Sequence, residues 1–168
     1  MATALFISLN ELKKNTNISG NIDPNKLLPA IKVAQELELE PILGTDLYNK
    51  ISNDILTDTL SGDYLTLKTN YIHDILIHMS VYYYLPYATY QITNGGVSKW
   101  NGGDNFESIN KDDLTLLANK QKSIGESYKK RLITHLCNNS TLYPEYSTNS
   151  GEDIDPTRNT NRSGLYLN

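Results

Sequence analysis

The residue types that most often do chemistry are few in this sequence, and their spacing does not suit a shared site. The chain has three histidines and one cysteine. His73 and His78 are five positions apart, so on a helix their side chains point about 140° away from each other. His135 and Cys137 are two positions apart and would lie near opposite sides of a helix. No zinc-type spacing of cysteine and histidine occurs, so we expect no metal site.

Acidic residues gather around a glycine-rich segment, at Asp104, Glu107, Asp112 and Asp113. Their order lacks the ligand, glycine and terminal-glutamate pattern of an EF-hand, so helix capping by Asp112 or Asp113 is the favoured interpretation. No glycine-rich phosphate-binding motif occurs either. We therefore predict no catalytic residue, no cofactor and no enzymatic activity. An enzyme built on His73, Asp74 or His135 would require those groups to line one pocket.

Bulk composition excludes two other classes of protein. The net charge of −4 argues against a dedicated nucleic-acid binder, which normally carries a basic face. The one basic run, Lys129 to Arg131, is more typical of a solvated helix face. The longest apolar stretch, residues 71–92, contains an aspartate, two histidines and a proline, so we predict that it is not a membrane span.

Start signals and apolar spacing predict a series of helices. Ser8 and Glu11 form a capping box for a short helix from Leu9 to about Asn15. Asp23 and Pro24 start a second helix, which should end at Pro41 and Gly44. Thr45 is expected to cap a third helix, whose buried side is predicted to carry Leu47, Tyr48, Ile51 and Ile55.

Two longer helices follow, separated by turn signals. The first is expected over about residues 64–90, with an apolar stripe of Leu65, Ile72, Leu76, Met79 and Tyr83. Asparagine–glycine steps then predict a small β-hairpin or ordered loop at about residues 91–110. The last helix should run to about Asn138, with a stripe of Leu114, Leu117, Gln121, Ile124, Tyr128, Leu132 and His135.

These elements predict a mainly α fold: an antiparallel helical bundle with a projecting hairpin and an extended C-terminal arm. We place a helical domain at residues 1–146 and the arm at residues 147–168. The arm has few apolar side chains, so it cannot offset an ordering cost of about 1–2 kcal/mol per residue by itself. We therefore expect neighbouring subunits to support both the arm and the hairpin.

A subunit interface is the functional site that this organisation predicts. A tryptophan on a projecting turn has little of its own core to bury it, which favours contact with a partner at Trp100. The tyrosines at the end of the long helix fit either the bundle core or an interface. The predicted interface comprises Tyr87, Tyr90, Val97, Trp100, Tyr143, Tyr146, Ile154, Leu165, Tyr166 and Leu167.

Several segments together resemble a known family. The segments are Asn21 to Gln35, Ile42-Leu43-Gly44-Thr45-Asp46-Leu47-Tyr48, Tyr90 to Val97 with its Ile-Thr-Asn-Gly-Gly-Val run, and Asn139 to Tyr146. Their order resembles head–tail connector (adaptor, or ring) proteins of tailed bacteriophages, especially crAss-like phages. The resemblance covers about residues 5–146 and leaves the arm uncovered.

The resemblance implies a structural virion protein rather than an enzyme. Such proteins form a homo-oligomeric ring, usually of twelve copies, below the portal protein, where they extend the DNA channel and join the capsid to other connector or tail proteins. Localisation in the virion neck, after assembly in the bacterial cytoplasm, is implied as well. Net negative charge suits a channel through which genomic DNA passes without specific binding. The alternative is a small monomeric helical binding or regulatory protein encoded by a phage.

Overall fold

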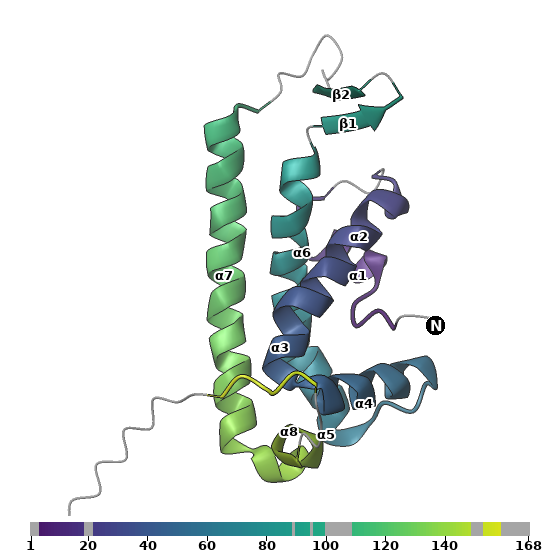
Figure 1. The fold of residues 1–168 in the computed structure, drawn as a ribbon, viewed down its shortest axis with the longest axis vertical. Helices are drawn as coiled ribbons and strands as arrows, with labels where there is room; N and C mark the ends of the chain where they lie inside the picture. The colour runs from purple at the N-terminus through teal and green to yellow at the C-terminus, as the bar shows by residue number, and fades with distance from the viewer. Residues whose placement is uncertain are drawn as a thin grey trace, which may run out of the picture.

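The computed structural model describes residues 4–18, 22–88, 90–94, 96–99, 109–148 and 153–158. The chain folds mainly into helices, as predicted, and the long helix α7 (Lys111–Asn138) runs antiparallel beside α6 (His73–Ala88) (Figure 1). Helix α2 (Pro24–Ala34) crosses α6 on its other side. The hairpin lies at one end of the molecule and α8 (Pro144–Thr148) at the other (Figure 1).

The predicted helix starts near the N-terminus are confirmed. In α1 (Leu9–Lys14), the Ser8 hydroxyl accepts from the Glu11 amide and the Glu11 carboxylate accepts from the Ser8 amide, which completes the capping box. At the start of α2, the Asp23 side chain accepts from the Asn25 amide and Pro24 occupies the first turn. Both signals are local, so the sequence was enough to locate them.

The second helical run ends at Gly44, as predicted, but Pro41 does not stop it. After α2 the chain forms a π-helical segment, η1 (Gln35–Leu39), and then α3 (Glu40–Leu43). Pro41 lies in the first turn of α3, where a missing amide hydrogen costs little. Helix α4 (Thr45–Leu56) follows without a side-chain cap, so the prediction that Thr45 caps it is wrong. The Thr45 hydroxyl instead accepts a hydrogen bond from the Ile154 amide.

The predicted long central helix is present, with one change of register. It consists of α5 (Gly62–Leu67), the π-helical η2 (Lys68–Ile72) and α6. Ile72, Leu76 and Met79 are buried as predicted, whereas Leu65 is 45% exposed and does not belong to the buried stripe. A π-helical turn contains about one residue more than an α-helical turn. The residues that face the core in α5 are therefore out of register with those in α6.

Strands β1 (Tyr90–Thr93) and β2 (Gly96–Lys99) form the predicted antiparallel hairpin, with Ile92 opposite Val97. Helix α7 ends at Asn138 as predicted, but its N-cap is Asn110 rather than Asp112 or Asp113. The Asn110 side chain accepts from the Asp113 amide at 2.8 Å. A 3₁₀ turn, η3 (Ser140–Leu142), leads into α8.

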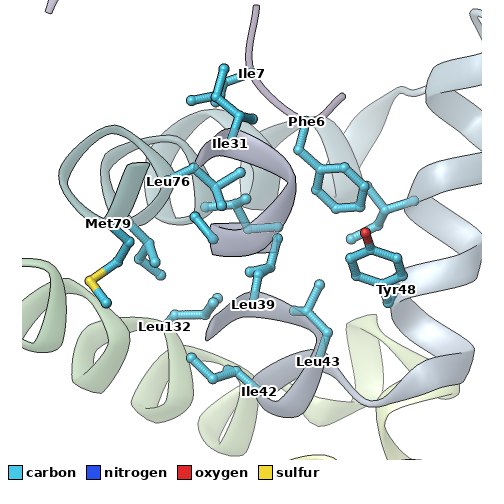
Figure 2. Packing of buried hydrophobic residues seen from close by; sticks show 14 of the residues in the cluster. Phe6, Ile7, Ile31, Leu39, Ile42, Leu43, Tyr48, Leu76, Met79 and Leu132 are labelled. Carbon is cyan, nitrogen blue, oxygen red and sulfur yellow. The ribbon is translucent and has the colours of Figure 1, made fainter. Parts of the chain in front are cut away.

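One hydrophobic core joins α2, η1, α3, α4, α6 and the C-terminal half of α7 (Figure 2). Phe6 stacks on Tyr48 with ring centres 5.0 Å apart, and Leu132 of α7 packs on the same core as Leu39 and Met79. The buried Gln35 side chain anchors the N-terminal segment, since its oxygen accepts from the Phe6 amide and its nitrogen donates to the Ala4 carbonyl. No helix in the described part of the chain is long and apolar enough to cross a membrane.

Candidate subunit interface

Large apolar side chains are exposed where α6 and α7 reach the hairpin. Tyr87 is 71% exposed, Tyr90 51% and Val97 70%. On the first turns of α7, Leu116 is 68% exposed and Leu117 46%. We call these five residues the distal surface.

The distal surface exists because α6 and α7 extend beyond the core. The last buried residue of α6 is Tyr84 and the first buried residue of α7 is Ala118. Past these positions the two helices and the hairpin stand at the end of the molecule, away from α4, α5 and α8 (Figure 1). Apolar side chains here have no third layer to pack on, and such patches commonly mark contact sites.

Tyr87, Tyr90 and Val97 are thus exposed, as a contact with a neighbouring chain would require. Leu116 and Leu117 were missed by sequence reasoning, which placed Leu117 in the buried stripe of α7. Two adjacent leucines on a helix cannot both face a narrow buried stripe. The Leu116–Leu117 pair in the sequence therefore already indicated that at least one of the two is exposed.

Tyr143 and Tyr146 were predicted to contact other chains, and for these two residues the prediction is wrong. Tyr143 is 1% exposed and Tyr146 is 2% exposed within their own chain. The Tyr143 ring packs edge-on against Tyr64, and its hydroxyl lies 3.1 Å from His135 Nε2. The turn through η3 leads the chain from α7 into α8, and both rings belong to the hydrophobic core.

The first two residues of the predicted arm, Ser147 and Thr148, belong to α8, and the described residues 153–158 also rest on their own chain. The Thr45 amide donates to the Ile154 carbonyl at 3.1 Å, and the Thr157 amide donates to the Pro41 carbonyl at 2.9 Å. The Tyr146 hydroxyl donates to the Thr157 carbonyl at 3.0 Å. These bonds correct the expectation that the arm lacks internal support.

The physical reason lies in the junction between α3 and α4. Helix ends leave carbonyl and amide groups without intrahelical partners, and Gly44 ends α3 directly before α4 begins. The arm satisfies one carbonyl of α3, at Pro41, and the first amide of α4, at Thr45. Pro156 is buried against Gly44. Ile154 nevertheless remains 43% exposed. Trp100, Leu165, Tyr166 and Leu167 lie outside the described residues.

The histidines do not converge on one site. His73 Nδ1 lies 3.2 Å from the neighbouring Asp74 carboxylate, and His78 Nδ1 lies 2.7 Å from the Gln121 side-chain oxygen on α7. His135 bonds to Tyr143 and Asn139 instead. No group of three or more potential metal ligands occurs in the described ranges.

A comparison with protein families gives a match. The profile named "Family of unknown function (DUF6712)" matches residues 39–155, from η1 through the docked start of the arm. Searches of curated proteins and of solved structures found no match. Because the match covers more than half of the chain, this protein belongs to the Family of unknown function (DUF6712).

Proposed function

We propose that this chain is a structural subunit of a phage virion: a head–tail connector that assembles into a ring below the portal protein. The distal surface is the observation that carries the proposal, because it exposes five large apolar residues at the end of a folded, well-packed body. Burial of apolar area stabilises an interface by about 25 cal/mol per Å² before association costs. The resemblance of its sequence segments to connector proteins supplies the biological context.

A closed ring needs heterologous contacts, in which one face of a subunit meets a different face of the next. The distal surface lies at one end of the molecule (Figure 1), and in this proposal it meets a different face of the next subunit. In this proposal the ring binds the portal protein and tail components through its rims, and genomic DNA passes through its channel. No catalytic step is involved.

The test compares assembly of three purified proteins by light scattering and cryo-EM class averages. The wild type is expected to form rings. The variant Tyr87→Ser/Val97→Ser/Leu116→Ser should remain monomeric with unchanged thermal unfolding, because these side chains are exposed in the monomer.

The matched control is Leu56→Ser/Leu65→Ser, which removes comparably exposed apolar side chains from α4 and α5 and should assemble normally. A wild type that stays monomeric at micromolar concentration would refute the ring and favour the monomeric regulatory protein. If the triple variant assembles as well as the wild type, the distal surface does not contribute to ring assembly.

A further inference from the structure

An open groove lies between the C-terminal half of α7 and η2. Its volume is about 460 Å³, and no acidic residue lines it. The side chains that matter for its chemistry are Tyr71, Lys130, Arg131, Thr134 and His135. It is a concavity lined by basic and not acidic residues, in a chain with a net negative charge.

The hydrogen bonds of the histidine in this groove, His135, fit its neutral form. The Asn139 side-chain nitrogen lies 3.2 Å from His135 Nδ1 and also donates to the His135 carbonyl, so Nδ1 must accept. Nε2 then carries the proton and donates to the Tyr143 hydroxyl, which in turn donates to the Asp63 carbonyl. Burial lowers the pKa of His135, in agreement with this arrangement. The positive charge of the groove therefore comes from Lys130 and Arg131.

Neither cation is neutralised within the described part of the chain. Lys129, next to them, forms ion pairs with Glu38 at 2.6 Å and Glu126 at 2.8 Å, but Lys130 and Arg131 have no ion pair there. The Arg131 guanidinium lies over the rings of Tyr71 and Tyr128, 5.7 and 5.5 Å from their centres. Stacking fixes the plane of a guanidinium and leaves its edge for a carboxylate or phosphate.

An uncompensated acidic patch occurs elsewhere on the chain. Glu36 and Glu40 are one helical turn apart on η1 and α3, and Asp153 of the docked arm lies close enough to interact with Glu40. Burial, then the negative charges of Glu36 and Asp153, raise the pKa of Glu40. No ion pair to these three carboxylates occurs among the described residues. Leu37, beside them, is 62% exposed.

The groove and the patch face different directions. Glu38 reaches α7, where it accepts from Lys129. Glu36 and Glu40 lie about half a turn around the helix from Glu38, on the side away from α7. One subunit therefore cannot bring its own patch to its own groove, but it can meet two neighbours at once.

We propose that the groove of one copy receives the acidic patch of the next copy of this chain. The inference rests on the proposed ring and identifies a second pair of surfaces within it. Charge complementarity selects the partner: two unpaired cations face a patch of three unpaired carboxylates with an exposed leucine to cover the apolar part of the groove. A nucleic acid fits less well, since His135 and Arg131 already lie against the ring of Tyr71, which a base would need for stacking.

The experiment is a charge exchange, read by light scattering and native mass spectrometry. Lys130→Glu/Arg131→Glu and Glu36→Lys/Asp153→Lys are purified separately, and each should need at least about tenfold more protein than the wild type to assemble. All four residues are exposed, so the monomer fold should survive. Lys130→Glu alone serves as a variant that leaves the stacked arginine in place.

Mixing the two double variants should restore rings in which they alternate, because each reversed groove then meets a reversed patch. Normal assembly of either double variant alone would overturn the inference, and so would a mixture that fails to assemble. If the wild type forms rings while either of these results is obtained, only the groove–patch contact is refuted and the proposed ring is not. A monomeric wild type would refute both proposals. Binding of a single-stranded oligonucleotide that is lost on Lys130→Glu/Arg131→Glu, without any effect on assembly, would assign the groove to nucleic acid instead.

Discussion

The contact between Gly44 and Pro156 allows a direct test of how firmly the arm is docked. Gly44 has φ +74° and ψ 158°, a region open almost only to glycine. A Cβ at this position would lie 2.8 Å from Pro156 Cδ. The substitution Gly44→Ala therefore introduces backbone strain and a collision with the arm, and the two effects can be separated.

Backbone strain alone is expected to lower the free energy of unfolding by about 1–3 kcal/mol. The collision adds a second loss, but the chain can avoid it by releasing the arm, so the docking free energy sets its upper limit. The hydrogen bonds of the arm contribute about 0.5–1.5 kcal/mol each, and ordering its residues costs about 1–2 kcal/mol each. These contributions nearly cancel, so the second loss should not exceed about 2 kcal/mol.

The assay is urea unfolding of Gly44→Ala in the full chain and in a chain that ends at Ser150. The loss should be larger in the full chain, and the difference measures the loss from the collision, which the docking free energy limits. Gly62→Ala is the matched control, because Gly62 also has a positive φ, 58°, but has nothing within 4 Å of an added Cβ. Its loss of about 1–2 kcal/mol should be the same in both chains.

Hydrogen exchange gives an independent readout, since the Thr45 amide donates to the Ile154 carbonyl only when the arm is docked. Protection of this amide should fall in the shortened chain and in Gly44→Ala. Equal losses for Gly44→Ala in both chains would refute the packing of Pro156 on Gly44. No loss in either chain would refute the backbone conformation itself.

Three further predictions concern the packing and titration of the helical body. Gly125→Ala should destabilise the protein by about 1–3 kcal/mol although alanine favours helices, because its Cβ would collide with the Met79 sulfur; the double variant with Met79→Ala should lose less than the sum of the single losses in urea unfolding. Burial alone raises the pKa of Glu38, but hydrogen bonds from Lys129 and Tyr83 and the charge of Lys129 outweigh it, so this pKa lies below its usual value. The resulting stability is complete above the unfolded pKa of about 4.3 and is lost as the pH falls below it, and Glu38→Gln should remove that part of the pH dependence in unfolding at pH 6 and pH 3. An NMR titration should find His135 protonated on Nε2 only, and still neutral at a pH where a free histidine is half charged; a doubly protonated ring at pH 6.5 would contradict its hydrogen-bond assignment.

Local signals in the sequence were sufficient for much of the fold. The capping box at Ser8 and the Asp23-Pro24 start each involve groups within a few residues, so their geometry follows from the sequence itself. The hairpin follows from the turn signal around Asn94 for the same reason. The π-helical segments η1 and η2 could not be predicted, because they depend on how the helices pack rather than on residue preference.

The candidate interface was only partly predictable, because burial of an aromatic residue depends on distant segments. Tyr87 and Tyr146 are both tyrosines near the end of a helical element, yet one is 71% exposed and the other 2%. Tyr146 is buried because its hydroxyl meets Thr157 and Cys137, and no pattern around Tyr146 reveals these contacts. Composition also suggested that the arm was unsupported, because it reflects only the number of apolar side chains and does not reveal that the arm bonds to the Pro41 carbonyl and the Thr45 amide.

Because residues 153–158 of the arm already bind to their own chain, we expect assembly to depend on the distal surface instead. A neighbour that bound residues 153–158 would first have to replace the hydrogen bonds that these residues already make to Pro41 and Thr45. Tyr87, Val97 and Leu116 are exposed before any partner arrives, so burying them requires no such exchange and gains free energy from the first contact. Assembly through the end of α6 and α7 is therefore favoured over exchange of the docked part of the arm. On this reasoning, a chain without the residues after Ser150 should still form rings, weakened only by the loss of Asp153 from the acidic patch, whereas the distal serine variants should abolish ring formation.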